Sequence, residues 1–337
     1  MLRTDLMRIL SIAVLFSVVI AATAYLSVRS WLSTPLPITD GHLVELPAGS
    51  SSSRLARELV DQDLLEYPDL FRVWTRINGI DTRLKAGEYE LQPGDSLLSL
   101  LEKIQRGDTR HYTFTLIEGW NIRQLLAALR EHPQIVSTLD RVDSEMLMQA
   151  LDSDYAHPEG MFLPDTYHID KGTRDIDLLK RAHEDLLEVL EESWAQRDEG
   201  LPLKRPYDAL ILASIIEKET AVGEERALIS GVFHNRLNIG MRLQTDPTVI
   251  YGIGEAYDGD IRFRDLRTDT PYNTYTRHGL TPTPIAMPGR EAIMAAVQPA
   301  ETEYLFFVAH SDRSGRHIFT STLAEHEAQV DIHQRRR

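Results

Sequence analysis

Hydrophobic residues are densest at the start of the chain, in a run that holds no charge. Residues 9–26 read ILSIAVLFSVVIAATAYL, and Arg3 and Arg8 precede them. An apolar run of this length can cross the hydrocarbon core of a membrane, and cationic side chains before it favour a cytoplasmic N-terminus. We therefore predict a cytoplasmic segment over 1–8, a transmembrane anchor over 9–26, and a remainder of the chain outside the cytoplasm.

The same run has a second interpretation, a cleaved signal peptide. Residues 22–24, Ala-Thr-Ala, supply the small-x-small pattern of a cleavage site. After the run, residues 27–42 include Pro35 and Pro37 and show no amphipathic period, which predicts an extended linker. In both interpretations the working part of the protein is exported.

A first folded module is predicted over residues 43–107. It opens with a strand-like run from Leu43, and residues 87–91 alternate like a second strand. Apolar side chains recur at helical spacing between and after these strands, and Ser96 can cap the last helix. The positions with helical spacing are Leu55, Leu59, Leu64, Leu70, Val73, Trp74, Ile77, Leu97, Leu100, Leu101 and Ile104. This is a small α+β unit of about the minimum size that folds alone.

The remaining residues, 108–337, form a larger module. Its first segment, HYTFTLIEG, has a strand pattern, and Asn121 can cap the helix that follows. From there to about Lys204 the pattern is mostly helical. An ordered loop is predicted over 157–168, where glycine and two prolines interrupt the helical period.

Composition excludes some classes of function. The 337 residues carry 36 Lys and Arg against 51 Asp and Glu, a net charge of −15, which repels polyanions and makes nucleic acid an unlikely partner. The absence of cysteine excludes disulfides, thiolate metal sites and cysteine nucleophiles. His157, Glu159, Asp165 and His168 share the loop over 157–168, but their spacing matches no recognised ligand motif. We expect no metal and no cofactor.

The segment over 206–220, PYDALILASIIEKET, is the sharpest candidate for chemistry. Pro206 suits the first turn of a helix, and Asp208 adds favourable negative charge there. At about 100° per residue, Glu219 lies at the end of an apolar stripe, whereas Glu217 lies nearly opposite. The stripe consists of Leu212, Ile215 and Ile216. A carboxyl group held against apolar neighbours resists ionisation, as a general acid near neutral pH must.

Glu219 also has an ordinary interpretation, a solvated side chain at a fraying helix end that pairs with Lys218 or Arg226. Downstream, a second amphipathic helix is predicted over 224–238. Asp246 and Pro247 form a good N-cap and N1 pair for a further helix. Loops after it contain tyrosines and an asparagine, which suit sugar rings but are also common turn residues.

Taken in order, a series of motifs closely resembles the MltG/YceG-like family of endolytic murein transglycosylases. The motifs are LIEGWN, EGMFLPDTY, ASIIEKET, GVFHNRLNIGMRLQTDPTVIYG, YNTY and YLFFVA. The resemblance covers nearly the whole chain. It implies an α+β fold with an N-terminal transmembrane helix, a small LysM-like subdomain over 43–107, and a larger mixed α/β catalytic domain over 108–337 with the catalytic Glu at a helix end.

The family resemblance also implies a reaction and a location. The reaction is non-hydrolytic cleavage of the bond between MurNAc and GlcNAc inside newly made glycan strands, in cell wall biogenesis, with termination of strand elongation as a further role. The location is the inner membrane, with a single pass and the catalytic domain in the periplasm. Expected partners are peptidoglycan, the membrane and peptidoglycan synthases of the elongation or division machinery.

Site residues follow from the resemblance position by position. Glu219 and Thr220 match the place where lytic transglycosylases look like Glu-Ser after an apolar helix, so Glu219 takes the catalytic role. Glu217 is a supporting residue or second choice. Gln244, Tyr251, Asn273 and Tyr275 are candidates for lining the cleft.

One loop departs from the family pattern. Where the family commonly reads Gly-Leu-Pro-Pro-Gly-Pro-Ile, residues 279–285 read Gly-Leu-Thr-Pro-Thr-Pro-Ile, which changes the flexibility and shape of that loop.

Two other functions compete with this one. A hydrolytic muramidase would normally need a second carboxylate to hold water or to form a glycosyl-enzyme, for which Asp246 and Glu217 are the candidates. A membrane-anchored peptidoglycan-binding scaffold would need no chemistry at all. The EKET segment argues against a scaffold, because binding alone does not need a carboxylate on an apolar face.

Overall fold

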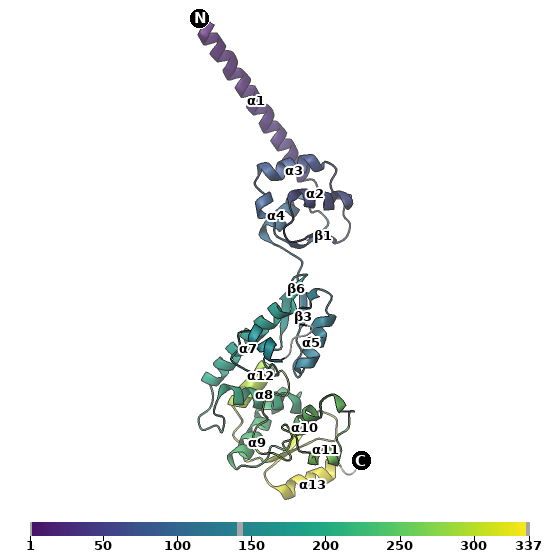
Figure 1. The fold of residues 1–337 in the computed structure, drawn as a ribbon, viewed down its shortest axis with the longest axis vertical. Helices are drawn as coiled ribbons and strands as arrows, with labels where there is room; N and C mark the ends of the chain where they lie inside the picture. Colours follow the sequence, from purple (N-terminus) through teal and green to yellow (C-terminus); the bar gives the residue numbers. More distant parts are fainter. Residues whose placement is uncertain (1, 140–143, 335–337) are drawn as a thin grey trace. The chain divides into compact units, whose positions relative to one another are not determined.

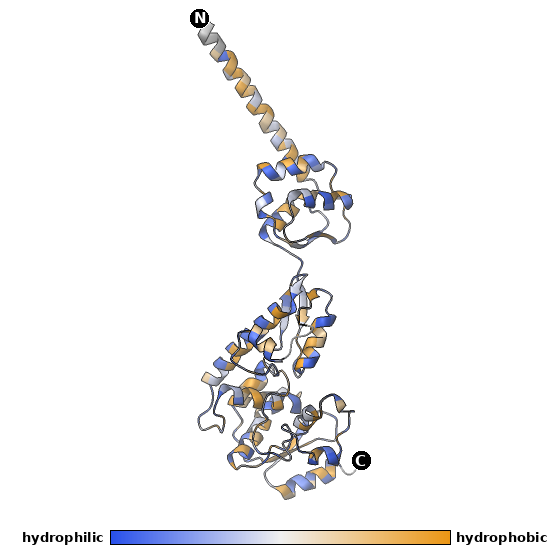
Figure 2. Ribbon diagram, in the orientation of Figure 1, coloured by the Kyte–Doolittle hydropathy of each residue, from blue (hydrophilic) through white to orange (hydrophobic). Residues whose placement is uncertain are grey.

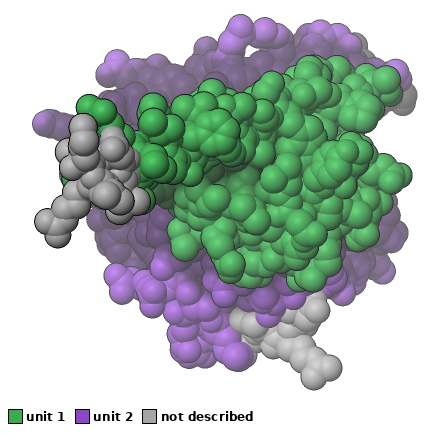
Figure 3. All heavy atoms as spheres, turned by 90° about the horizontal axis from the view of Figure 1, so that it is seen from above, with its two compact units in different colours: residues 1–112 green, residues 113–337 purple. Residues whose placement is uncertain are grey.

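The computed structural model describes residues 2–139 and 144–334 of the chain. The chain divides into two compact units, Met1–Tyr112 and Thr113–Arg337, drawn in different colours in Figure 3. Helices dominate both units, and each sheet in the described part of the chain has two strands. The fold is therefore a mixture of helix and sheet, which confirms the predicted α+β class.

Unit 1 begins with the long helix α1 (Leu2–Leu32) and continues as a small module (Figure 1). Its elements are β1 (His42–Leu46), α2 (Ser52–Asp61), α3 (Pro68–Ile77), a 3-10 turn (Asp81–Arg83), β2 (Gly87–Leu91) and α4 (Leu97–Arg106). The strands pair antiparallel, with Val44 opposite Tyr89. As predicted, Ser96 caps α4, and its hydroxyl accepts a hydrogen bond from the Ser99 N–H at 3.2 Å.

The linker predicted over 27–42 is wrong for residues 27–32, because α1 continues through them to Leu32. The reason is packing that the sequence pattern did not reveal. Leu32 is fully buried in the core of unit 1, and Val28 and Trp31 pack against that core. These positions, three and four residues apart, give the end of α1 a face on the module. Leu36, beyond the helix, is also buried there.

Unit 2 holds most of the helices. Its elements are β3 (Tyr112–Thr115, beginning at the unit boundary), α5 (Ile122–Glu131), β4 (Ile135–Val136), α6 (Ser144–Ala150), β5 (Thr166–Ile169), β6 (Thr173–Arg174), α7 (Asp175–Ala195), α8 (Pro206–Glu219), α9 (Arg226–Asn238), α10 (Asp246–Ile253), α11 (Phe263–Arg267), α12 (Arg290–Val297), β7 (Phe306–Ala309), β8 (His317–Thr320) and α13 (Leu323–His333), with 3-10 turns at Gly223–Glu225 and Gly254–Ala256. Strands β3 and β5 pair, as do β4 and β6, and β7 pairs antiparallel with β8.

Helix α8 is the centre of unit 2. It contacts α7, α9, α10 and α12, and every residue over 209–216 is buried. The predicted start is confirmed: Pro206 occupies the first turn, and the Asp208 carboxylate accepts hydrogen bonds from the N–H groups of Lys204 and Arg205 at 3.0 and 3.1 Å. The Asn121 cap of α5 is confirmed as well.

Helix α10 begins one residue earlier than predicted. Its N-cap is Thr245, and Asp246 already has helical geometry, so Asp246 and Pro247 are not the N-cap and N1 pair. Thr245 has extended backbone angles (φ −120°, ψ 125°), but its hydroxyl does not cap the helix. It turns instead toward the end of α8.

Candidate active site

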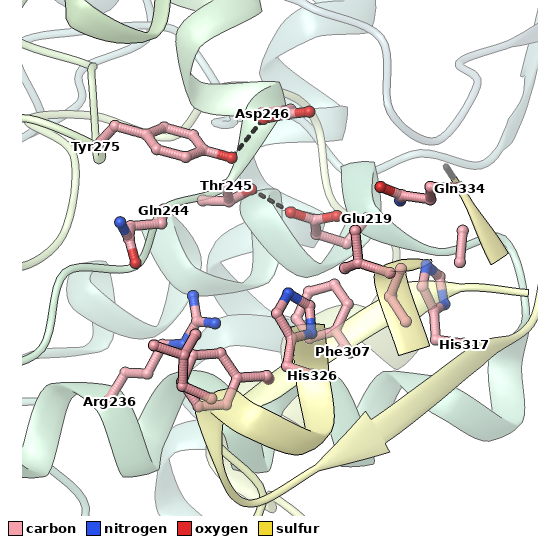
Figure 4. A pocket seen from close by; sticks show the side chains of 15 residues that line it. Glu219, Arg236, Gln244, Thr245, Asp246, Tyr275, Phe307, His317, His326 and Gln334 are labelled. Atoms are coloured by element: carbon pink, nitrogen blue, oxygen red, sulfur yellow. Dashed lines mark hydrogen bonds between the residues drawn. The ribbon is translucent and has the colours of Figure 1, made fainter. Parts of the chain in front are cut away.

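Glu219 is the last residue of α8, and its side chain faces a cavity of about 460 Å³ (Figure 4). Segments distant in sequence form the walls: the ends of α8 and α9, the chain leading into α10, the loop before α12, and the hairpin β7–β8 with α13. The lining residues are Glu219, Arg236, Gln244, Thr245, Asp246, Tyr275, Phe306, Phe307, Val308, Ala309, His317, Leu323, His326, Val330 and Gln334.

The surroundings of Glu219 hold its proton near neutral pH. Burial raises the pKa of its carboxyl to about 7, although a hydrogen bond from the Thr245 hydroxyl lowers the pKa. The negative charge of Asp246 raises it further, and the positive charge of Arg236 lowers it. At neutral pH a substantial fraction of Glu219 therefore carries a proton, which is the condition for a general acid.

The apolar face behind Glu219 is confirmed, because Leu212, Ile215 and Ile216 are fully buried. The alternative pairing with Lys218 or Arg226 is wrong. The Lys218 ammonium donates to the Gly119 carbonyl at 3.1 Å, and Arg226 pairs with Glu291. The partner of Glu219 is the Thr245 hydroxyl.

Asp246 is the second carboxylate of the cavity. The Tyr275 hydroxyl donates to its Oδ1 at 2.6 Å (Figure 4). Burial and the Asp246 charge both raise the pKa of Tyr275, so the phenol stays protonated and remains a donor. Gln244, beside Thr245, has φ +48°, a left-handed conformation that is uncommon for a residue with a side chain. Such backbone strain often occurs at functional sites.

Arg236 supplies positive charge on the wall formed by α9. It is 7% exposed, and its Nε donates to the Leu305 carbonyl at 2.6 Å, while Nη1 donates to the Leu243 carbonyl. The guanidinium also lies over the Phe306 ring, 5.5 Å from its centroid. A guanidinium has five N–H donors, so these contacts fix its position and leave donors for a ligand.

His317, the first residue of β8, is held by a buried carboxylate. Both oxygens of Glu225 are used: one accepts from the His317 backbone N–H at 3.0 Å, and the other lies 2.8 Å from Nδ1. In the neutral tautomer that a carboxylate at Nδ1 favours, Nδ1 carries the proton and Nε2 is an acceptor. His326 of α13 is the second imidazole of the cavity and stacks on Phe306 at 5.2 Å.

Comparison with known proteins identifies the family. Residues 44–332, most of the chain, match the YceG-like family. The chain belongs to the YceG-like family. An endolytic murein transglycosylase of Bacillus subtilis is 32% identical over 301 residues, which cover 84% of this chain and 82% of the relative. One from Streptococcus pneumoniae serotype 2 is 26% identical over 94% of this chain and 64% of its own length.

A solved structure also resembles this YceG-like chain. The crystal structure of a putative YceG-like protein from Listeria monocytogenes matches with a TM-score of 0.54 and 29% sequence identity. The match covers 86% of this chain and 98% of the other. The architecture described here is therefore shared along almost the full length of that protein.

Of the residues predicted for the site in this YceG-like chain, Glu219, Gln244 and Tyr275 meet at the cavity, and Glu217, Tyr251 and Asn273 lie elsewhere. The Glu217 carboxylate accepts from the Gly289 N–H at 3.0 Å and is 3.9 Å from Arg226.

Tyr251 and Asn273 each make contacts that hold the fold. The Tyr251 hydroxyl donates to Glu159 at 2.9 Å. Glu159 is buried, with its pKa raised to about 7 by desolvation, and it also accepts from the Ile122 N–H at 3.0 Å. The Asn273 amide donates to three carbonyl oxygens in and after α11, those of Asp265, Leu266 and Thr268.

The sequence interpretation missed Arg236, Thr245, His317 and His326 as cavity residues. Thr245 and Arg236 stand inside quoted motifs, LQTDP and HNRL, so position within the motif was an available signal. The two histidines come from the C-terminal hairpin and helix, about a hundred residues after Glu219. Nothing in local spacing connects them to α8.

Proposed function

We propose that this YceG-like protein is an endolytic peptidoglycan lytic transglycosylase with Glu219 as its catalytic acid and base. The observation that carries the proposal is the carboxyl of Glu219 on the wall of a polar cavity, where burial raises its pKa to about 7. The names of its relatives, endolytic murein transglycosylases, support the same reaction. The proposed bond is the one between MurNAc and GlcNAc within a glycan strand.

One carboxyl group suffices because the nucleophile belongs to the substrate. Protonated Glu219 gives its proton to the glycosidic oxygen as the bond from MurNAc C1 to that oxygen breaks. The resulting carboxylate accepts the proton of the MurNAc C6 hydroxyl as O6 bonds to C1. Glu219 regains its proton, water does not enter, and the new end is 1,6-anhydro-MurNAc.

The neighbours of Glu219 suit the charge changes of this reaction. The Thr245 hydroxyl donates to the carboxylate and stabilises it after proton transfer. The carboxylate of Asp246 lies where it can stabilise positive charge that develops on the sugar ring. The remaining donors of Arg236 can bind substrate carbonyl or hydroxyl groups.

The proposal includes a location. In α1, Met7–Leu32 is long and apolar enough to cross a membrane by length and composition. We propose that α1 is a single-pass anchor in the inner membrane and that unit 2 works in the periplasm. The β–α–α–β order of β1, α2, α3 and β2 supports a LysM-like role in glycan binding. Peptidoglycan synthases are proposed as further partners.

The test uses the full chain in detergent or nanodiscs with purified glycan strands and mass spectrometry of the products. The wild type should give anhydro-MurNAc ends and a spread of strand lengths. Glu219→Gln keeps the shape of the side chain and loses the titratable proton, so the rate should fall by about a thousandfold.

The matched control is Glu217→Gln, on the same helix two residues earlier. Its carboxylate contacts the Gly289 N–H outside the cavity, so this variant should retain most activity. Reducing MurNAc ends, heavier by one water, would indicate a muramidase that uses Asp246. Binding of strands without cleavage by the wild type would indicate a scaffold.

A further inference from the structure

Helix α3 has an apolar face that the described residues of unit 1 leave exposed. Its inner face is buried through Phe71, Trp74 and Thr75. On its outer face, Leu70 is 38% exposed, Val73 54% and Ile77 72%. At 100° per residue these three side chains lie within about 60° of one another and form one stripe. We call Leu70, Val73 and Ile77 the outer stripe of α3.

Helix α3 lies at the end of unit 1 from which α1 projects, whereas β1 lies at the other end (Figure 1). Ring contacts fix α3 against α1. The Tyr25 ring stacks on Trp74 at 4.6 Å, and its hydroxyl donates to Asn78 at 3.3 Å. Trp31 meets the edge of Tyr67, the N-cap of α3, at 5.7 Å. The depth of α1 in any membrane that it crosses therefore also determines the depth of α3.

The level of the membrane follows from the length of α1, which is hydrophobic along most of its projecting part (Figure 2). From Arg8 to Tyr25 the helix is about 26 Å long at 1.5 Å per residue, close to the hydrocarbon thickness of about 30 Å. With Arg8 at one interface, Tyr25 lies at the other, where tyrosine and tryptophan are enriched. Helix α3, in direct contact with Tyr25, then lies in the headgroup layer.

We propose that the outer stripe of α3 inserts into the headgroup–acyl boundary of the membrane that α1 spans. The proposal rests on the proposed single-pass anchor. A lipid surface is the occupant that the position favours, because the stripe is apolar and exposed and its helix packs on α1 at Tyr25. Arg76 is exposed on the same helix, where it can meet lipid phosphates, as in helices that lie in the membrane interface; Arg72 is also exposed but pairs with Asp69.

The consequence is a second point of attachment. One helix through a membrane leaves the domain free to tilt and rotate, whereas α1 and α3 together hold unit 1 in one orientation on the membrane surface. The direction in which the chain leaves unit 1 toward unit 2 is then fixed relative to the bilayer.

The absence of cysteine from the chain makes a site-specific test clean. Single cysteines are placed at Val73→Cys and Ile77→Cys in the full chain, labelled with an environment-sensitive fluorophore, and reconstituted into nanodiscs of phosphatidylethanolamine and phosphatidylglycerol. Lipids brominated near the headgroup end of the acyl chain serve as quenchers. The matched surface control is Glu45→Cys on β1, and the membrane reference is Phe16→Cys in α1.

Labels at 73 and 77 should be quenched severalfold more by brominated lipid than the label at 45. The proposal is overturned if labels at 73 and 77 respond like the label at 45 while the label at 16 is strongly quenched. It is also overturned if they are shielded from aqueous iodide without lipid quenching, since another protein surface or a second copy then covers the stripe. No quenching at 16 would instead reject the anchor.

Discussion

The protonation of Glu219 results from opposing neighbours that can be changed one at a time. Burial and the charge of Asp246 raise the pKa, whereas the Thr245 hydroxyl and the charge of Arg236 lower it. The proposed first step needs the protonated form, so activity should fall as pH rises through the pKa of about 7. The neighbours of Glu219 then set the pH at which activity falls, which is the alkaline limb of the pH–activity profile.

Thr245→Val and Asp246→Asn should move the limb in opposite directions. Valine keeps the shape of threonine and removes the donor that stabilises the carboxylate, so the pKa of Glu219 rises and the limb moves to higher pH. Asparagine removes the negative charge of Asp246, so the pKa falls and the limb moves to lower pH. Each shift should be about one pH unit, the size expected for about 1.4 kcal/mol. The measurement is kcat/KM for glycan cleavage from pH 5 to 9, and shifts of the same sign would contradict this account.

Glu225 and His317 offer a test of ring orientation in the same cavity. Glu225→Gln keeps an acceptor for the His317 backbone N–H, but its amide can donate to Nδ1. The opposite tautomer then becomes favourable, and Nε2 turns from an acceptor into a donor. If substrate donates to Nε2, kcat/KM should fall by about tenfold, the value of one hydrogen bond.

A double-mutant cycle separates this effect from a general loss of structure. In His317→Asn, the shorter amide can still reach Glu225 but leaves nothing at the Nε2 position. Adding Glu225→Gln to that variant should then cost little more. Additive losses with a lower melting temperature would mean that the pair only holds β8 in place.

At residue scale, helical periodicity predicted the apolar neighbours of Glu219, because a face of a helix depends on residues one turn apart. Every residue over 209–216 is buried, however, so the apolar stripe alone did not single out Glu219. Helical periodicity could not show which residues lie across the cavity from Glu219. Thr245, Arg236 and His317 reach the cavity through tertiary packing across separate elements. Tyr251 and Asn273 illustrate the converse: aromatic and amide groups in loops fit a sugar site by type, yet their donors are used to hold other parts of the fold.

At the scale of elements, the loop over 279–289 runs along α8 and is fixed to it. The Ile285 N–H donates to the Ser214 hydroxyl at 3.0 Å in the middle of the helix. Thr281 and Thr283 also donate to carbonyl oxygens of the loop, at 2.8 Å each, so the departure from the family pattern adds hydrogen bonds to this loop. Gly160 lies against the same loop.

Gly160→Ala and Gly200→Ala form a matched pair for the packing under this loop. Both glycines have φ +77°, so alanine brings the same left-handed strain of about 1 kcal/mol at each. A Cβ at Gly160 would also lie 2.3 Å from the Pro284 Cβ, whereas at Gly200 it meets nothing within 4 Å. Gly160→Ala should therefore cost about 2 kcal/mol more than Gly200→Ala in denaturant unfolding. Equal losses would show that the loop moves aside freely.

Element boundaries show where sequence reasoning fails and why. The caps at Ser96 and Asn121 and the acidic first turn at Asp208 were predicted because the groups involved are close in sequence. The start of α10 was wrong by one residue, because Asp246 is already helical and Thr245 is the N-cap, although the Thr245 hydroxyl bonds to Glu219 and not to the helix. The end of α1 was missed because its apolar face forms only against the folded module.

At the scale of the whole molecule, the extension of α1 to Leu32 changes how this apolar helix relates to the module that follows it. A flexible linker would let the module move independently of the membrane, but Leu32 is part of its core. The helix is also continuous across residues 22–24, the small-x-small site of the signal-peptide interpretation. Cleavage within α1 would therefore affect the stability of unit 1 as well as the location of the protein.

We predict that the mature protein keeps α1. Cleavage after Ala24 would place a charged amine on Tyr25, whose ring stacks on Trp74 at 4.6 Å, and would remove the hydrophobic segment before it. The intact mass of protein extracted from membranes should include residues 9–24, and extraction should require detergent rather than high salt, because a spanning helix is not held by charge. A mature N-terminus at or near Tyr25 in the salt-soluble fraction would establish the signal peptide instead. The outer stripe of α3 would then remain on the surface without the anchor on which its membrane contact depends.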